Sequence, residues 1–455
     1  MPLLYQYIDE TATYMDTQSY MNPLASELNV VLDGSITGRL LSSLGSRLFF
    51  PRGIIAQSNE AKQLAPVKNA TIGMAFHHGQ PLILSAISDA MPTLSAKEKV
   101  TYAPTAGVEE VRKAWKDSLL KKNPSLKAGD ITLPAAVPGV TAGISFAADL
   151  FLDETSTIIA SDPCWDNYSL IFTERRGAKL RGVPFFGEPS SWDAGAGLDL
   201  AAIRAAIHEE AKTGSVRIIF NFPNNPAGYS PTHAEADALV DIIRETACNG
   251  ADILVICDDA YFGLFYEDDI YRESLFSRLS ALHEKVLAIK IDGPTKEDYV
   301  WGLRVAFVTF GSPGLGPEHR EALGKKLMGA IRSSVSCANT PAQYLILKVL
   351  SDPRTAGEKK ANYELLRGRY RAVQSFIATH PAHPKLSPMP FNSGYFMSFR
   401  CKGIDAEVLR KKLLAEHGIG TISLGPGILR VAFAALEEEQ IAEIYGTIYE
   451  TAGKL

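Results

Sequence analysis

The chain has 455 residues, of which 46% are hydrophobic and 21% charged, an ordinary composition for a globular protein with a large core. Its formal net charge of −5 makes nucleic acid a poor partner, because phosphate backbones are bound by clustered Lys and Arg. No run of about 18 or more apolar residues is present, so the sequence predicts no membrane span.

The five cysteines indicate a reducing compartment, and we expect a cytoplasmic protein. Their number is odd and no two stand in a CxxC spacing, which argues against a disulfide framework and a thiolate zinc site. The nine histidines form no HExxH pair, so no metal is expected. The first residues also lack the basic and apolar regions of a signal peptide.

Helices and strands alternate through the middle of the chain. Helical periodicity is clear at residues 108–121, 232–246, 317–331 and 340–350. Short runs rich in β-branched residues occur at residues 157–160, 216–220, 253–257 and 286–289. Near-continuous apolar strands separated by helices are typical of a mostly parallel sheet with helices on both faces. The sequence therefore predicts an α/β fold with a large domain at residues 65–340.

The pattern changes after residue 340. Residues 355–380 predict a long charged helix. Tyr395, Met397 and Phe399 recur at every second position, as in a half-buried strand, and residues 429–433 predict another strand. We therefore expect a smaller α+β domain at residues 341–455, with an N-terminal segment, residues 1–64, packed against it.

The segment after the strand at residues 216–220 has an unusual composition. Ligands of parallel sheets bind beyond the carboxyl ends of the strands, so this place favours a functional role. Residues 221–228 are Asn-Phe-Pro-Asn-Asn-Pro-Ala-Gly, in which two prolines and a glycine favour a fixed turn. Such a turn could aim the amide of Asn225 at a ligand. A plain turn is the alternative, although the octapeptide is far more specific than any dipeptide in it.

Two aspartates and a tyrosine follow the strand at residues 253–257. A carboxylate that leaves a buried strand needs a partner, because an unpaired buried charge is costly. Asp258 or Asp259 could supply this carboxylate, and Tyr261 lies close by in sequence. The alternative is an aspartate that only caps a helix.

Lys296 lies in a predicted loop after the strand at residues 286–289, and Arg304 follows eight residues later. A lysine amine is a good nucleophile only when desolvation or a nearby cation lowers its pKa. Arg304 is suited to bidentate phosphate contact. A lone lysine is normally a surface residue. Its position after a strand and shortly before Gly-Leu-Arg favours a chemical role.

A glycine-containing turn precedes the apolar run at residues 144–152. Residues 138–143 are Pro-Gly-Val-Thr-Ala-Gly. Glycines before a helix leave backbone N–H groups free, and a helix N-terminus favours an anion. The segment lacks the Gly-Lys-Ser/Thr ending of a Walker motif, and a plain strand-to-helix turn is the alternative.

Together these four segments resemble the class I aminotransferases, fold-type I enzymes that depend on pyridoxal 5′-phosphate (PLP) and include aspartate and aromatic aminotransferases. The resemblance extends from about Tyr102 to Arg430. It implies a homodimer with shared active sites. It also implies transfer of an amino group from an L-amino acid to a 2-oxo acid by a ping-pong mechanism. Lys296 would form a Schiff base with PLP and later carry the proton between substrate and cofactor.

The same resemblance assigns the cofactor contacts. Asp258 would pair with the ring nitrogen, with Asp259 as the competing choice. Tyr261 and Asn225 would hydrogen-bond the phenolic oxygen. Arg304 would hold the phosphate. The other implied cofactor-binding residues are Gly139, Val140 and Thr141 at the phosphate, Trp165 against the ring, and Tyr102, which would reach the phosphate from the neighbouring subunit.

Substrate binding is implied in the same way. Arg430 matches the arginine that clamps the α-carboxylate, a planar bidentate task that lysine performs poorly. Asn225 and Trp165 would also contact the substrate. Arg332 resembles the residue that binds a distal carboxylate, although its spacing to the following Asn-Thr-Pro differs by about two residues. An aspartate-like or glutamate-like substrate is therefore one hypothesis, and aromatic or broad specificity is another.

Two positions depart from the pattern of the family. Gly293 stands where the family often has a serine, so Thr295 could supply the missing hydroxyl contact to the phosphate. The Pro-Gly pair often seen between the lysine and the arginine is replaced by Trp301-Gly302. Neither change removes a group that the chemistry requires.

Three other functions compete with this hypothesis. A fold-type I PLP lyase or decarboxylase would use the same residues, because a fold does not fix its chemistry. A non-catalytic ligand-binding protein on the same scaffold predicts loss of Lys296 or Asp258, and both are present. A Rossmann oxidoreductase needs Gly-x-Gly-x-x-Gly after its first strand, whereas Gly311, Gly314 and Gly316 lie late in the chain.

Overall fold

The computed structural model describes residues 21–33, 35, 41–49, 53–187 and 197–455. The chain divides into two compact units, residues 1–51 and residues 52–455. The predicted N-terminal segment, residues 1–64, lies partly outside the described residues, and the three predicted domain boundaries stay predictions. Among the described residues, no helix is both long enough and apolar enough to span a membrane.

The described part of the first unit contains two helices, α1 (Pro23–Leu32) and α3 (Ser43–Arg47). Asn22 caps α1 with its side chain, which satisfies one of the free N–H groups at the helix start. Asn29 of α1 donates a hydrogen bond to the carbonyl of Ser46 in α3 at 3.0 Å. This bond ties the two helices to each other.

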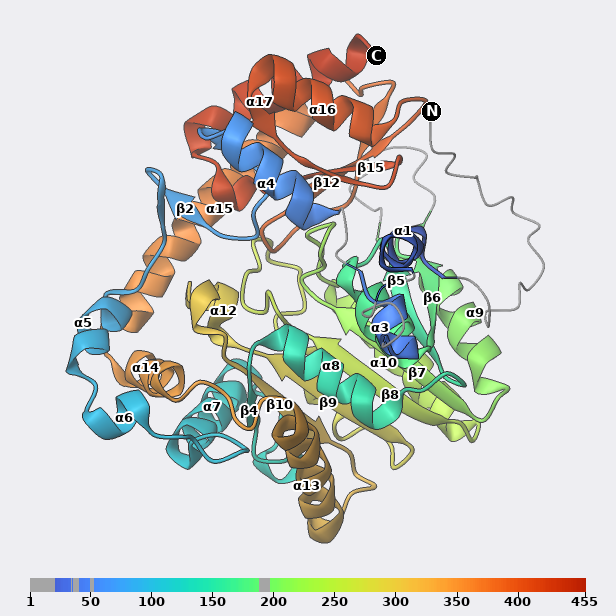
Figure 1. The fold of residues 1–455 in the computed structure, drawn as a ribbon, viewed down its shortest axis with the longest axis vertical. Coiled ribbons are helices and arrows are strands. Elements are labelled where there is room, and N and C mark those ends of the chain that lie inside the picture. The colour runs from blue at the N-terminus through green and yellow to red at the C-terminus, as the bar shows by residue number, and fades with distance from the viewer. Residues whose placement is uncertain (1–20, 34, 36–40, 50–52, 188–196) are drawn as a thin grey trace. The chain divides into compact units, whose positions relative to one another are not determined.

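A seven-stranded sheet forms the centre of the second unit (Figure 1). Its strand order is β4-β10-β9-β8-β7-β5-β6. The pairs from β6 to β9 are parallel, whereas β10 is antiparallel to both β9 and β4. The predicted mostly parallel sheet is therefore confirmed. The strands are β4 (Ala135–Val137), β5 (Thr157–Asp162), β6 (Lys179–Pro184), β7 (Ser215–Asn221), β8 (Asp252–Asp258), β9 (Val286–Asp292) and β10 (Ala306–Gly311).

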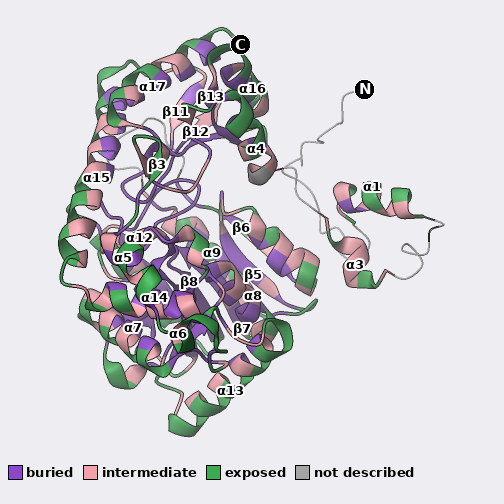
Figure 2. Cartoon of the chain, turned by 60° about the vertical axis from the view of Figure 1, so that its left-hand side comes forward, coloured by how far each residue is buried: buried purple, intermediate pink, exposed green. Residues whose placement is uncertain are grey.

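Successive residues of a strand point to opposite faces of the sheet. Apolar side chains are buried on both faces here, because helices cover each of them. In β8, Ile253 and Val255 pack in a core with α9, α10 and α11, whereas Leu254 and Ile256 pack in a core with α8. Figure 2 shows the buried central strands beneath helices with exposed outer faces. The helices are α5 (Ser85–Thr93), α6 (Ala96–Val100), α7 (Glu109–Lys122), α8 (Val140–Phe151), α9 (Leu200–Ala211), α10 (His233–Cys248), α11 (Leu275–Leu279), α12 (Pro294–Glu297), α13 (Pro317–Ser334) and α14 (Thr340–Ser351).

Three short helical turns complete this part of the chain. Two are 3₁₀ turns and one is a π-helical turn. They are Ala128–Asp130, Trp301–Leu303 and Ser169–Glu174 respectively.

The C-terminal part builds a second, antiparallel sheet in the order β11-β12-β15-β14. Helix α4 contacts β13 and β14, and the long helix α15 packs against α17. Strand β1 (Lys68–Asn69) pairs with β13 in parallel. The other elements are α4 (Ile54–Leu64), β2 (Phe76–His77), β3 (Gln80–Pro81), α15 (Thr355–Thr379), β11 (Leu386–Pro388), β12 (Met397–Cys401), α16 (Ala406–His417), β13 (Ile419–Gly420), β14 (Ile422–Leu424), β15 (Ile428–Val431), the 3₁₀ turn Phe433–Ala435 and α17 (Glu438–Gly453).

The first three residues of β12 are buried on both faces of the strand, so the expectation of a half-buried strand was wrong for this part of it. Met397, Ser398 and Phe399 are all buried. Phe399 packs on Tyr445 of α17, with ring centroids 6.0 Å apart. On the other face, the hydroxyl of Ser398 donates a hydrogen bond to the carbonyl of Pro226 at 2.8 Å. The strand thus joins the C-terminal sheet to the octapeptide that follows β7.

A buried ion group lies beside the end of the central sheet. Lys290 of β9 is fully buried and pairs with Asp259 and, at 3.6 Å, with Asp292. The indole N–H of Trp115 donates a hydrogen bond to Asp292 at 3.2 Å. Removal of one member of such a group leaves unpaired buried charge, which is strongly destabilising.

Lys290→Met should therefore lower the free energy of unfolding by about 3–5 kcal/mol, because two buried carboxylates lose their cation. Lys285→Met is the matched control, since Lys285 pairs with Asp252 at 3.2 Å on the surface. Lys285→Met should lower the free energy of unfolding by no more than about 1 kcal/mol. Urea unfolding of both variants provides the measurement, and equal effects of the two substitutions would contradict the prediction.

Candidate active site

A cavity of about 120 Å³ opens at the carboxyl ends of β7 and β8. Most of the residues that the sequence predicted for a site line this cavity. Its lining comprises Val140, Thr141, Trp165, Asn221, Asn225, Asp258, Ala260, Tyr261, Thr295, Lys296 and Arg304. Segments that are far apart in the sequence therefore meet where parallel-sheet proteins bind their ligands.

Lys296 lies in the single turn of helix α12, not in a loop as predicted. Pro294 stands at the first position of this helix, where its missing N–H is not needed. The amine lies 4.8 Å from the centre of the Tyr261 ring. The hydroxyl of Tyr395 donates a hydrogen bond to the Lys296 carbonyl at 2.9 Å, which fixes the backbone.

The surroundings of Lys296 make its amine nucleophilic. Desolvation lowers the pKa of Lys296 to about 8, with a further contribution from the positive charge of Arg304. The negative charge of Asp258 opposes this shift. A useful fraction of the amine is therefore neutral near neutral pH, which is the state that attacks a carbonyl carbon.

Asp258 is the carboxylate that enters the cavity. Its Oδ2 accepts a hydrogen bond from the hydroxyl of Tyr168 at 2.5 Å, and its Oδ1 accepts one from the Ala260 N–H at 3.2 Å. Asn221 donates from its amide to the Asp258 carbonyl at 2.9 Å. Burial raises the pKa of Asp258 to about 6, although the hydrogen bond from Tyr168 and the charge of Lys296 act against burial.

Asp259 is held away from the cavity. It pairs with Lys290 and accepts a hydrogen bond from the Ser274 hydroxyl at 2.6 Å. No helix begins at either aspartate, since residues 260–263 form a turn. The alternative of a helix cap is therefore wrong, and the two aspartates have separate surroundings.

The start of helix α8 and Arg304 together form an anion-binding cradle. Gly139 precedes the helix with a φ of 91°, a conformation that favours glycine. A side chain on Gly139 would overlap the guanidinium of Arg304. The N–H groups of Val140 and Thr141 lie in the first turn, where no intrahelical acceptor exists. Such a helix start with an adjacent arginine suits a phosphate group.

Arg430 is buried and borders the cavity through Asn225. It donates one hydrogen bond to the Asn225 Oδ1 at 2.9 Å and another to the Thr71 carbonyl at 3.1 Å. Its guanidinium lies 4.3 Å from the centre of the Phe396 ring. The Nε of Arg430 has no hydrogen-bond partner among the described residues. A buried cation with a free donor is suited to bind a carboxylate.

Four residues predicted for the site do not line the cavity within one chain. Gly139 and Arg430 lie next to the lining residues Arg304 and Asn225, whereas Tyr102 and Arg332 lie on the surface. Tyr102 is 92% exposed, and Arg332 is exposed in the last turn of α13. Trp165 does line the cavity and packs edge-on against Tyr168, with ring centroids 5.6 Å apart. Thr295, the predicted substitute for a missing hydroxyl, is buried and lines the cavity.

Three residues of the site were missed by the sequence analysis. Asn221 opens the octapeptide, and its Oδ1 accepts a hydrogen bond from the Asn225 N–H at 2.7 Å, so the motif itself was a usable signal. Tyr168 stands three residues after Trp165, within a segment already considered. Thr71 gave no signal, because it contacts Arg430 only through its backbone carbonyl.

The chain matches the family model described as aminotransferase class I and II over residues 72–448. It is 25% identical to a probable aspartate/prephenate aminotransferase of Aquifex aeolicus, over 76% of this chain and 82% of that protein. It is 21% identical to an aspartate aminotransferase of Sulfurisphaera tokodaii, over 87% of this chain and 94% of that protein.

The fold is similar to solved structures of the same kind. An aminotransferase of Anaerococcus prevotii superimposes with a TM-score of 0.79 at 23% identity, over 91% of this chain and 99% of that chain. A multiple substrate aminotransferase of Thermococcus profundus gives a TM-score of 0.75 at 17% identity, over 92% and 98%. The chain belongs to the class I and II aminotransferases and is a PLP-dependent transaminase that moves amino groups between amino acids and 2-oxo acids.

Proposed function

We propose that Lys296, Asp258 and Tyr261 are the catalytic residues of this transaminase. The observation that carries the proposal is the desolvated amine of Lys296, which shares one cavity with the buried carboxylate of Asp258. PLP, when bound, supplies an electron sink for the bonds to the α-carbon of the amino acid. The protein supplies the positions and charges of the groups around it.

The residues of the cavity fit the separate parts of PLP. The anion-binding cradle suits its phosphate, and the carboxylate of Asp258 suits a protonated ring nitrogen. The phenolic oxygen and the ring face need hydrogen-bond donors and an aromatic wall. The residues proposed for these contacts are Gly139, Val140, Thr141 and Arg304 for the phosphate, Asn225 and Tyr261 for the phenolic oxygen, and Trp165 for the ring face.

Two residues act on the amino acid itself. Arg430 would bind the α-carboxylate, and its contacts with Asn225 and Thr71 fix the plane of the guanidinium. Lys296, with a pKa of about 8, would take the proton from the α-carbon of the amino acid and deliver it to the C4′ carbon of the cofactor. The positive charge of Arg304 favours the phosphate of the cofactor, and the positive charge of Arg430 favours the carboxylate of the amino acid.

For the substrate, we propose L-aspartate or L-glutamate as the amino donor, with aromatic amino acids as the second candidate. The names of the relatives support both choices, since they include aspartate, aspartate/prephenate and aromatic-amino-acid aminotransferases. Arg332 is the candidate for a contact with a distal carboxylate. Asn225 and Trp165, which line the cavity, are the candidates for further contacts with the substrate.

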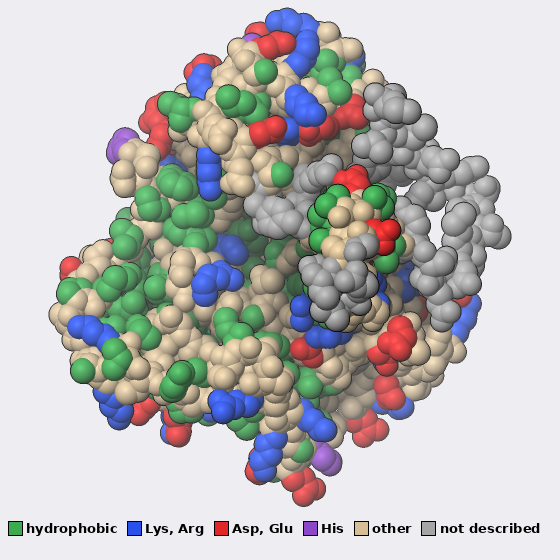
Figure 3. Space-filling model, viewed as in Figure 1, with side chains coloured by type: hydrophobic (Ala, Val, Ile, Leu, Met, Phe, Trp, Pro, Cys, Tyr) green, Lys and Arg blue, Asp and Glu red, His purple; other side chains and the backbone are tan. Residues whose placement is uncertain are grey.

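We also propose a homodimer in which Tyr102 and Arg332 complete the cavity of the partner subunit. Exposed apolar side chains support a partner surface at this place: Val100 is 81% exposed, and Ile83, Met91 and Val335 are exposed as well. Figure 3 shows hydrophobic side chains over α5 and α6. The five free cysteines support a reducing compartment, for which we propose the cytoplasm.

Asp258→Asn should lower kcat by about 100-fold or more, because a buried charge that supports the transition state is lost. Asp259→Asn is the matched control. It removes a neighbouring carboxylate, while Lys290 keeps Asp292 as its partner. The control should lose stability but keep a kcat close to that of the unchanged enzyme. Steady-state kinetics of both PLP-loaded variants provide the measurement. A larger loss of kcat in Asp259→Asn than in Asp258→Asn would make Asp259 the catalytic carboxylate.

The uptake of PLP by the cofactor-free protein should accelerate with pH and reach half of its limiting rate near pH 8, the pKa of Lys296. Only the neutral amine attacks an aldehyde, so the rate follows deprotonation. In Asp258→Asn the midpoint should move to lower pH, because the carboxylate that favours the charged amine is gone. Stopped-flow absorbance measures the rate, and a midpoint near the ordinary lysine value of 10.5 is the opposing result.

A panel of amino donors tests the proposed reaction and substrate, with 2-oxoglutarate as acceptor for every donor except glutamate, which is paired with oxaloacetate so that its product differs from the acceptor. Aspartate or glutamate should react fastest, with amine transfer detected by mass spectrometry. Arg332→Leu should lower kcat/KM for these donors by about tenfold or more, since a charge-assisted contact of about 1.5–3 kcal/mol is lost. Aromatic donors should be unaffected. Unchanged aspartate and glutamate turnover in Arg332→Leu rules out this role for Arg332.

Sedimentation equilibrium should show a dimer at micromolar concentration. Val100→Asp should weaken it, because a charge would enter the exposed apolar surface formed by residues 83–102. Val408→Asp is the control, since Val408 is 49% exposed on α16, in the C-terminal part. A monomer for the unchanged chain would contradict the proposed dimer.

A further inference from the structure

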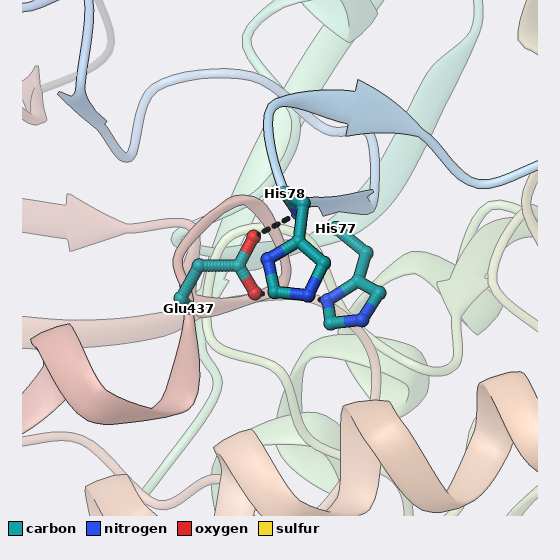
Figure 4. Close-up of side chains that lie close together, drawn as sticks. All are labelled: His77, His78 and Glu437. Atoms are coloured by element: carbon teal, nitrogen blue, oxygen red, sulfur yellow. Dashed lines mark hydrogen bonds and ion pairs between the residues drawn. The ribbon is translucent and has the colours of Figure 1, made fainter.

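Figure 4 shows a group of three potential metal ligands, none of which lines the cavity of Lys296. His77, His78 and Glu437 each offer one ligand atom, and these atoms all lie within 4.8 Å of one another. The two histidines belong to the hairpin of β2 and β3, whereas Glu437 is the N-cap residue of α17. The group therefore joins two segments that are about 360 residues apart in the sequence.

The turn of the hairpin brings the two imidazoles to the same side. Adjacent residues of an extended strand point to opposite faces, so neighbouring histidines would normally diverge. Here His78 has a φ of 49° and Gly79 a φ of 73°, and both lie in the left-handed region. The ring centroids of His77 and His78 are only 3.9 Å apart. A non-glycine residue in this conformation is uncommon, and such residues cluster at functional sites.

The carboxylate of Glu437 is held in a fixed orientation. Its Oε1 accepts a hydrogen bond from the His78 N–H at 2.5 Å, and its Oε2 lies 3.1 Å from Nδ1 of His77. Arg369 donates to the same Oε2 at 2.8 Å and to the carbonyl of Ala434 at 2.7 Å. Outer hydrogen bonds of this kind orient the ligands of metal sites and are found for most ligating carboxylates.

The local charge favours a cation in spite of Arg369. The guanidinium of Arg369 is fully buried and interacts with the charges of Glu437, Glu438 and Glu439, which begin helix α17. The three carboxylates carry more negative charge than the one arginine neutralises. An excess of negative charge raises the local concentration of cations.

We propose that His77, His78 and Glu437 bind one zinc ion, with solvent completing the coordination. Two imidazole nitrogens and one carboxylate oxygen are a ligand set that suits Zn²⁺ and similar transition cations. Mg²⁺ and Ca²⁺ prefer oxygen ligands alone. The ion would clamp the hairpin of β2 and β3 to helix α17, and it would stabilise the folded chain because it binds only where both segments are in place.

The test uses the full PLP-loaded chain, stripped of metals with a chelator and titrated with zinc chloride by calorimetry. One zinc ion per chain should bind. His77→Ala and His78→Ala should each weaken binding by at least about tenfold, since even outer partners of metal ligands are worth that much. The double variant His380→Ala/His383→Ala is the matched control, because it removes two other histidines and should leave zinc binding unchanged.

The folding of each variant is checked by circular dichroism and by the melting temperature without zinc. His78 is exposed, so its replacement by alanine should change neither. Zinc should raise the melting temperature of the unchanged chain and of the control, but not that of His78→Ala. The proposal is overturned if the unchanged chain binds zinc no more tightly than His78→Ala. Equal loss in the His380/His383 variant, or Mg²⁺ binding as tight as that of zinc, also overturns it.

Discussion

The site depends on one electrostatic constraint, the placement of the Lys296 amine and the Asp258 carboxylate in the same desolvated cavity. Desolvation lowers the pKa of the lysine to about 8 and raises the pKa of the aspartate to about 6, so each group moves toward its neutral form. Their mutual attraction limits both shifts. Part of the amine is thereby neutral near neutral pH, while the carboxylate of Asp258 keeps part of its negative charge.

The central sheet supplies this constraint, because its parallel strands deliver several polar groups to one edge. Asp258 ends β8, and Asn221 ends the adjacent β7 and holds the backbone of Asp258. Helix α8 adds a positive helix start, and Arg304 lies against Gly139 at that start. The C-terminal sheet contributes Arg430 from β15, which donates a hydrogen bond to Asn225 at the border of the cavity.

The mostly parallel sheet and most residues that line the cavity could be predicted from the sequence, because their signals are local. The octapeptide at residues 221–228, Asp258 and Lys296 each follow a strand whose apolar pattern is strong. The difference between Asp258 and Asp259 was not local, since it depends on Lys290, which lies 31 residues away in the sequence and binds Asp259. The burial of Ser398 in β12 likewise involves a distant segment, since its hydroxyl bonds to the carbonyl of Pro226, 172 residues away.

Other features of the site had no sequence signal. The carbonyl of Thr71 meets Arg430 across 359 residues, and any residue type can supply a carbonyl. The short helix around Lys296 is one turn long, too short for a periodic pattern. Tyr102 and Arg332 lie outside the cavity of their own chain, so their predicted roles require contacts that a single chain does not contain.

Borohydride reduction of the PLP-loaded enzyme, followed by peptide mapping, is the most direct test of the central claim. Reduction converts a lysine–PLP linkage into a stable phosphopyridoxyl label, which identifies the reacting amine. The account predicts one label per chain, on Lys296. A label on any other lysine, or a purified protein that takes up no PLP, would contradict it.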